Sequence, residues 1–264
     1  MKPSRQTAAI APMPPALARR SFVASIGICA FALKPARAEW LRDEIVVYAD
    51  PALRPVLAAL NAQFRSASGI RARCFCAPPG QMLGLLAHKT QDDVLITQAP
   101  FIADAASRGL TRGNATPLWR NHLVFAARGA AAPPVAFDAA HFADGKLALP
   151  DMSDASTIDG PALLAQIDPA GKIKNPILGA ADTQDAVAMV RRGEADIALC
   201  HISEVSNDPD IAAVFTISQD EYKPIEYQAA LSIDAWSRYQ DTYLTWLRTE
   251  AAPAARGFGL EVLS

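Results

Sequence analysis

The sequence predicts an α/β fold that opens with a strand, a helix and a second strand. The apolar segment Glu44–Ala49 is rich in β-branched and aromatic residues, as expected of a buried strand. Asp50 and Pro51 follow it and mark a helix start, because the Asp carboxylate accepts a free backbone N–H and Pro has none to leave unpaired. We therefore expect a parallel β-α-β unit whose strand-to-helix turns lie at the carboxyl edge of the sheet, where such sheets bind ligands.

An apolar stripe predicts the helix of this unit. Its members recur at helical spacing: Leu53, Val56, Leu57, Leu60 and Phe64. Gly69 ends the helix, because glycine tolerates the left-handed conformation of a helix terminus. The next strand is predicted at 70–76, and a loop at 77–80 leads into another helix. The turns at Asp50 and Gly80 should therefore lie side by side.

Strands and helices are predicted along the rest of the chain. Strands or extended segments are expected at 94–97, after an acidic turn at 92–93, and at 119–127, 146–150, 197–200 and 222–231. Helices are expected at 82–86, 101–108, 160–166, 183–191, 242–248 and 251–258. Alternation of this kind is typical of the α/β class. The length after the first 38 residues suits one large domain or two lobes of about 100 residues each.

The first 38 residues are predicted to be an export signal. Arg19-Arg20 followed by Phe22 resembles the twin-arginine pattern. An apolar segment continues to Leu33, and Ala36-Arg37-Ala38 is a small-x-small cleavage sequence. We expect the twin-arginine export machinery to carry the chain to the periplasm, with cleavage after residue 38. An ordinary secretory signal and an uncleaved anchor are the alternatives, although the apolar run is shorter than the ~20 residues that span a bilayer.

The charge balance excludes one class of partner. The whole chain has a formal net charge of −2. The predicted signal holds six basic residues and no acidic one, so cleavage leaves 19 basic and 27 acidic residues and a net charge of −8. Nucleic-acid binding needs a basic face, so we expect no nucleic-acid partner.

Three cysteines remain after the predicted cleavage: Cys74, Cys76 and Cys200. An odd number leaves at least one thiol unpaired within a monomer. We expect Cys74 and Cys76 to lie on opposite faces of their strand, so that a disulfide, if one forms, joins one of them to Cys200.

The order of the segments resembles that of periplasmic solute-binding proteins of ABC importers, nearest to the molybdate-binding proteins. The matching segments span nearly the whole predicted mature chain: Val47–Leu53, Phe64–Gly69, Asp92–Ile96, Asn121–Val124, Leu147–Asp151, Val187–Ala198, Glu226–Ala230 and Gly257-Phe258. The resemblance implies a type II periplasmic binding protein fold, in which two α/β lobes enclose a ligand cleft. It implies a first lobe at 39–121 plus 226–264 and a second lobe at 122–225.

The same resemblance implies a monomeric binding protein without a cofactor or catalytic residues, whose partners are a small solute and an importer permease in the inner membrane. The leading hypothesis for the solute is a tetrahedral oxyanion such as molybdate or tungstate. Backbone N–H groups at helix N-termini and hydroxyl groups hold such an anion without a countercharge. The implied ligand residues are Asp50, Ala52, Leu53, Gly80, Ser156, Thr183 and His201.

Several residues depart from the family pattern and keep other ligands open. Ala52 and Pro79 stand where the family has Ser, and His201 stands where it often has Tyr and would donate a hydrogen bond instead. Asp50 is an expected N-cap that would repel an oxyanion but could bind a cation or an amine. A soft metal or metal chelate is the main alternative, and its candidate ligands, chosen by residue type, are Asp50, Cys76, Cys200 and His201.

A periplasmic enzyme that uses Cys76 or Cys200 is a second alternative. The sequence contains no Gly-x-Ser-x-Gly elbow, no His-Glu-x-x-His and no phosphate-binding P-loop. The neighbouring His201 makes a poor dyad with Cys200, because adjacent strand residues face apart. We therefore expect a binding protein rather than an enzyme.

Overall fold

The computed structural model describes residues 44–88, 92–129, 134–139, 142, 145–151 and 158–263. The predicted signal peptide at 1–38 and the predicted ligand residue Ser156 lie outside the described residues. Across the described ranges, the strands form two six-stranded sheets. Within the same ranges, each helix is too short or too polar to cross a bilayer.

The first sheet carries the predicted β-α-β unit. Its strand order is β12-β4-β11-β3-β1-β2. The strands are β1 (Glu44–Ala49), β2 (Arg71–Cys76), β3 (Val94–Gln98), β4 (Thr111–Asn121), β11 (Ile225–Ser232) and β12 (Glu261–Val262). β1 pairs in parallel with both β2 and β3, whereas β11 runs antiparallel to β3 and β4. The parallel unit predicted from the sequence is confirmed, and antiparallel strands complete the sheet.

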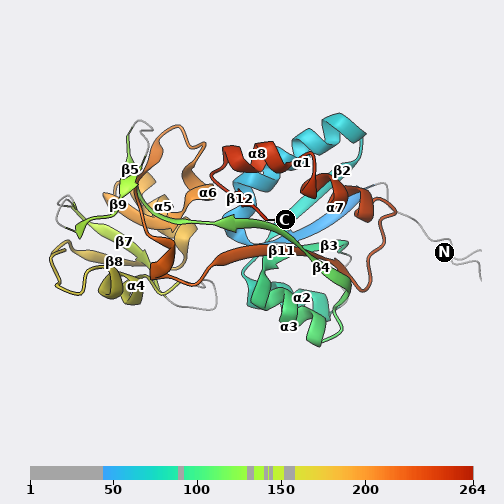
Figure 1. Cartoon of the computed structure of the whole chain (residues 1–264), viewed down its shortest axis with the longest axis horizontal. Helices are drawn as coiled ribbons and strands as arrows, with labels where there is room; N and C mark the ends of the chain where they lie inside the picture. The colour runs from blue at the N-terminus through green and yellow to red at the C-terminus, as the bar shows by residue number, and fades with distance from the viewer. Residues whose placement is uncertain are drawn as a thin grey trace, which may run out of the picture. The chain divides into compact units, whose positions relative to one another are not determined.

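Helices cover both faces of the first sheet (Figure 1). They are η1 (Pro51–Leu53), α1 (Arg54–Ser68), α7 (Gln240–Arg248) and α8 (Ala252–Gly257) on one face, and α2 (Pro79–Ala87) and α3 (Ala99–Ser107) on the other. Phe64 of α1 meets Tyr243 of α7 edge to face, with ring centroids 5.0 Å apart. Leu95 of β3 packs with Met82 of α2 and Ile102 of α3 on the opposite face. Burial on both faces explains why β1 and β3 are apolar along their length.

The second sheet has the strand order β6-β10-β5-β9-β7-β8. Its strands are β5 (Leu123–Arg128), β6 (Val135–Ala136), β7 (Leu147–Pro150), β8 (Ile177–Ala180), β9 (Ile197–His201) and β10 (Ile211–Thr216). Its helices are α4 (Gly160–Ile167), α5 (Thr183–Arg192), α6 (Ile202–Val205) and η3 (Gln219–Glu221). β9 is antiparallel to β5 and parallel to β7, so the sheet is mixed like the first.

The chain passes from the first sheet to the second at His122. The prediction of one strand at 119–127 is wrong at this point, because β4 ends at Asn121 and β5 begins at Leu123 in the other sheet. The side-chain oxygen of Asn121 accepts the His122 N–H at 3.0 Å, and the Leu123 N–H donates to the Tyr222 hydroxyl at 3.0 Å. These side chains replace the pairing that a continuous strand would have. The chain returns to the first sheet between β10 and β11.

The sequence analysis assigned no structure to β8, β10 and α6. Each is short, with four to six residues. The residues of β10 form an apolar run, Ile211 to Phe215, but a run of this length does not distinguish a strand from a helix by periodicity. The two long amphipathic helices α1 and α5 were predicted to within two residues at each end, apart from the first turn of α1. There Asp50 caps the 3-10 turn η1, which leads directly into α1.

Asp93 joins three parts of the first sheet. Its carboxylate accepts the Val46 N–H at 2.8 Å and the N–H groups of Trp236 and Ser237 at 2.7 and 2.6 Å. The residue is 1% exposed, so water does not replace these bonds. The side chain thus fixes β1 to the entry of β3 and to the turn after β11.

We predict that Asp93→Ala destabilises the fold by about 3 kcal/mol or more, because it leaves three N–H groups without their acceptor and each such loss costs about 1–3 kcal/mol. Denaturant unfolding followed by circular dichroism measures the change. Asp104→Ala, which removes an exposed partner of Arg108, is the control and should leave the midpoint nearly unchanged. Equal midpoints for both variants would contradict the assigned role of Asp93.

Candidate functional site

A buried polar cluster contains three of the predicted ligand residues. Asp50 follows β1, Thr183 is the first residue of α5, and His201 ends β9. Their exposed fractions are 5%, 6% and 4%. Thr183 Oγ1 lies 3.3 Å from His201 Nδ1, and the charge of Asp50 acts on His201. The cluster therefore joins residues from both sheets.

Two hydrogen bonds hold the turn after β1 against the helices of the second sheet. Ser203 Oγ donates to the Ala52 carbonyl at 2.9 Å and accepts a hydrogen bond from Asn121 Nδ2 at 2.8 Å. Gln184 Nε2 donates to the Pro51 carbonyl at 2.5 Å. The start of α1 is thus connected to α5 and α6 in the described arrangement.

Glu204 is the central acceptor of the cluster. One carboxylate oxygen accepts the Thr183 hydroxyl at 3.0 Å, and the other accepts the His201 backbone N–H at 2.9 Å and lies 3.3 Å from His201 Nδ1. Its side chain is 4% exposed. Glu204 was not predicted from the sequence, although Glu three positions after an N-cap residue, here His201, is a capping-box signal.

The surroundings of His201 favour its protonated form. Burial alone lowers the pKa of His201, but the hydrogen bond and charge of Glu204 and the charges of Asp50 and Asp182 outweigh burial. The pKa of His201 is therefore raised above its usual value of 6.5. Among the buried side-chain atoms that the structure describes, His201 Nε2 has no hydrogen-bond partner. In the protonated imidazolium this nitrogen is a free donor.

Asp50 occupies the turn that the oxyanion hypothesis assigned to the ligand. Its carboxylate accepts the Ala52 N–H at 3.0 Å, and its carbonyl accepts the Leu53 N–H at 3.0 Å. The two backbone donors predicted for an anion are thus already paired. Burial raises the pKa of Asp50, the charge of His201 and the Ala52 hydrogen bond lower it, and the net shift is upward.

The helix starts next to the cluster are all capped by acidic side chains. Asp50 caps η1, and Asp182 caps α5 by accepting the Asp185 N–H at 2.7 Å. Glu204 accepts the backbone N–H of His201, the residue that precedes α6. Three carboxylates thus act on one imidazole within the described residues, and the cluster carries net negative charge even when His201 is protonated.

A cavity of about 160 Å³ opens beside this cluster. It lies between the start of α1 and the helices α5 and α6, and its lining includes Pro55, Gln184, Arg191 and Glu204. Arg191 is paired with Asp208 at 2.5 Å, so its positive charge is balanced by that carboxylate. The cavity is large enough for a small solute.

The remaining predicted residues lie in different surroundings. β1 and β2 end side by side, with Ala49 opposite Cys76, as predicted for the turns at Asp50 and Gly80. Gly80 is exposed in the first turn of α2. Cys200 is fully buried in the apolar cluster formed with α5 residues such as Val187.

The soft-metal set does not form a metal site. Within the described ranges, no three His, Cys, Asp or Glu side chains lie close enough together to hold a metal ion. Cys76 pairs with Cys74, at an Sγ–Sγ distance of 3.6 Å, and Cys200 faces the core. The prediction that Cys74 and Cys76 lie on opposite faces is wrong, because residues two apart on a strand share a face.

The chain forms two mixed sheets, and a buried polar cluster lies at strand ends from both of them. This is the fold of a type II periplasmic binding protein, which confirms the predicted fold class. The chain belongs to the bacterial extracellular solute-binding protein family, whose sequence model matches residues 45–261. The resemblance inferred from the order of the segments is thus confirmed. None of the curated proteins matches the chain.

Solved structures share the fold at low sequence identity. The periplasmic molybdate-binding protein of Azotobacter vinelandii has a TM-score of 0.68 at 14% identity, covering 83% of this chain and 100% of its own. Peb3 of Campylobacter jejuni has a TM-score of 0.61 at 14% identity, covering 82% and 99%. The sulfate-binding protein SubI of Mycobacterium tuberculosis has a TM-score of 0.60 at 14% identity, covering 84% and 87%. These similarities establish the fold.

We predict that Glu204→Gln lowers the pKa of His201, because it removes the charge that most strongly favours the imidazolium while burial remains. A pH titration of the imidazole followed by NMR measures the shift. Glu194→Gln is the matched control, since Glu194 is exposed and pairs with Arg192. A His201 pKa that is equal in wild type and Glu204→Gln would contradict the assigned contact.

Proposed function

We propose that this chain is the periplasmic substrate-binding component of an ABC importer, which captures a small solute and delivers it to a permease in the inner membrane. Membership of the solute-binding family and the type II fold support this role. The observation that carries the proposed binding site is the buried cluster of Asp50, Thr183, His201 and Glu204, which joins residues from both sheets.

The two sheets correspond in this proposal to the two lobes. The first lobe comprises 39–121 and 226–264, and the second comprises 122–225. The sheet membership of the strands and the passage at His122 support these boundaries. The segment 1–38, with Arg19-Arg20, acts as the twin-arginine export signal and is removed after export. The mature protein acts as a monomer.

The solute in this proposal carries positive charge, such as an ammonium group. Carboxylates already occupy the helix starts beside the cluster, and the amides of Ala52 and Leu53 are paired with Asp50. A further anion would therefore meet repulsion, and it would not gain the amides of Ala52 and Leu53 as donors. A cation would relieve the unbalanced charge of the buried carboxylates instead. Among the predicted ligand residues, Asp50 and Thr183 contribute to this site, and Glu204 joins them.

An oxyanion such as molybdate or tungstate is the second candidate. It is favoured by the donor at His201 Nε2, which is buried without a partner among the described side chains, and by the name of the Azotobacter vinelandii neighbour. In this case Gly80 and Ser156 would add donors. Asp50 would have to take up a proton on binding, which its raised pKa makes easier.

Calorimetry separates the two candidates by the effect of charge. Asp50→Asn keeps an N-cap oxygen for the Ala52 N–H but removes the charge. We predict that it weakens binding of a cationic solute by about tenfold to a hundredfold, because a hydrogen bond to a charged group contributes about 1.5–3 kcal/mol. The probes are a panel of amines and amino acids, compared with molybdate, tungstate and sulfate.

Asp159→Asn is the matched control, because Asp159 caps α4 in the same manner, accepting the Ala162 N–H at 2.9 Å. The affinity of Asp159→Asn for each probe should equal that of wild type. Heat from molybdate with wild type, together with tighter molybdate binding by Asp50→Asn, would overturn the cationic assignment in favour of the oxyanion. Absence of heat from every probe in the panel would count against both candidates.

The pH dependence has opposite signs in the two cases. A cation binds more tightly as pH rises through the raised pKa of His201, because the imidazolium loses its competing charge. An oxyanion binds more weakly over the same range. We predict a rise in affinity of up to about tenfold per pH unit, the limit for one proton released. Titrations between pH 6 and 8 measure the slope, and a falling affinity would contradict the prediction.

A further inference from the structure

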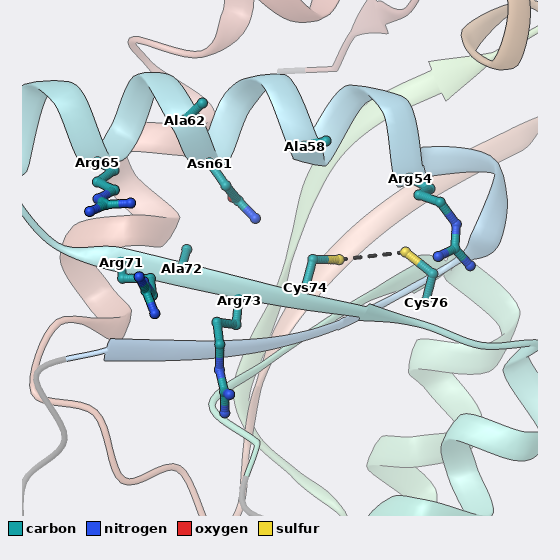
Figure 2. Close-up of a pocket in the computed structure, with 10 residues that line it drawn as sticks. All are labelled: Arg54, Ala58, Asn61, Ala62, Arg65, Arg71, Ala72, Arg73, Cys74 and Cys76. Carbon is teal, nitrogen blue, oxygen red and sulfur yellow. Dashed lines mark hydrogen bonds between the residues drawn. The ribbon is translucent and has the colours of Figure 1, made fainter.

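A second pocket lies between α1 and the edge strand β2, and two thiols line it (Figure 2). Its volume is about 410 Å³. Among the described lining residues, four are arginines and none is acidic: Arg54, Arg65, Arg71 and Arg73. Arg73 pairs with Glu44 at 3.2 Å, whereas the described residues form no ion pair with Arg54, Arg65 or Arg71. The pocket therefore attracts anions, although the chain as a whole is acidic.

Cys74 and Cys76 form a close pair in this pocket. Their Sγ atoms are 3.6 Å apart, and both side chains project from β2 toward α1 (Figure 2). Both residues are partly exposed, unlike the buried Cys200. The side chain of Arg54 lies next to Cys76 in the same view. The two thiols thus share a face of the strand and an opening to the pocket.

The surroundings make the two thiols unequal. The hydrogen bond from Cys74 lowers the pKa of Cys76, which outweighs burial, and the charge of Arg54 lowers it further. The same hydrogen bond and burial raise the pKa of Cys74. Cys76 is therefore the thiol that more readily forms a thiolate, and the thiolate is the nucleophile in disulfide exchange.

We propose that Cys74 and Cys76 are a reactive dithiol that exchanges with anionic low-molecular-weight disulfides bound in the arginine-lined pocket. The Cys76 thiolate attacks one sulfur of the disulfide R–S–S–R, so that a Cys76–S–S–R bond forms and RS⁻ leaves with the electron pair of the broken bond. Cys74 then loses its proton to solvent and attacks the Cys76 sulfur, which releases the second RS⁻. The pair loses two electrons to form a disulfide, and the small disulfide is reduced to two thiols.

The geometry of β2 allows this closure and keeps it reversible. Residues two apart on a strand are about 6.6 Å apart at Cα, which lies near the upper end of the range of about 4.4–6.8 Å for disulfides. A bridge at that limit is readily reduced. The sulfurs lie 3.6 Å apart, so closure needs rotation of the two side chains together with a local adjustment of β2, which is an edge strand.

The test uses the full mature protein, reduced with dithiothreitol and then freed of it. Three disulfides are compared at equal concentration: anionic oxidised glutathione, neutral 2-hydroxyethyl disulfide and cationic cystamine. Thiol titration gives the rates, and intact-mass and peptide mass spectrometry locate the products. We expect wild type to form the Cys74–Cys76 bridge, Cys74→Ser to accumulate the mixed disulfide on Cys76, and Cys76→Ser to lose most of the reaction.

Arg54→Gln tests the charge of the pocket. The substitution should lower the ratio of the rate with oxidised glutathione to the rate with 2-hydroxyethyl disulfide by roughly threefold or more, since a charged cleft raises association rates by about 10-fold to 1,000-fold. Arg108→Gln is the control, because Arg108 is exposed and paired with Asp104 in α3, and it should leave that ratio unchanged. Thermal unfolding confirms that each variant is folded. Wild-type rates for Cys76→Ser, or an unchanged ratio in Arg54→Gln, would overturn the proposal.

Discussion

A buried carboxylate at the end of the first strand governs the arrangement around it. Asp50 ends the apolar strand β1, caps the turn into α1, and lies among side chains of the second sheet. Because burial disfavours its charge, the carboxylate depends on the Ala52 N–H and on the positive charge of His201. His201 in turn depends on Glu204, which also binds Thr183. Each polar group of the cluster therefore stabilises the charge state of the next.

The same turn connects the proposed solute site with the thiol pocket. α1 begins immediately after the turn that Asp50 caps, and its first residue, Arg54, lies beside Cys76. The negative charge of Asp50 raises the pKa of Cys76, in opposition to Arg54. The carboxylate of Asp50 thus acts on His201 in one site and on Cys76 in the other, so that the electrostatics of the two sites are coupled. A change in the charge of Asp50 should alter the pKa of His201 and the pKa of Cys76.

The elements with strong local signals were predictable from the sequence. The Asp-Pro start and the apolar stripe of α1 specify that helix locally, and α5 has a similar stripe that ends at Gly193. The break between β4 and β5 at His122 was not predictable from local patterns, because it involves a hydrogen bond from Leu123 to Tyr222, 99 positions away, although the family resemblance implied a lobe boundary at the same place. The short strand β10 lacks a period that would identify it.

The candidate site was predictable only in part, for the same reason. Asp50, Thr183 and His201 stand at strand ends and helix starts, which local patterns indicate. Ser203 and Asn121 are residues of ordinary type whose role arises from contacts made across the two sheets. Glu204 had a local signal, the spacing of a capping box, but its bond to Thr183 is tertiary. Local sequence therefore gave the positions of the turns, and tertiary packing set the charge of the site.

Identification of the natural solute tests the central claim most directly, namely that the buried acidic cluster is a solute site that selects by charge. The protein would be exported, released from the periplasm without dialysis, and analysed by native mass spectrometry followed by denaturation to release the bound molecule. We predict one small, positively charged solute per chain in wild type and its loss in Asp50→Asn. Recovery of an oxyanion, or equal occupancy in both proteins, would contradict it.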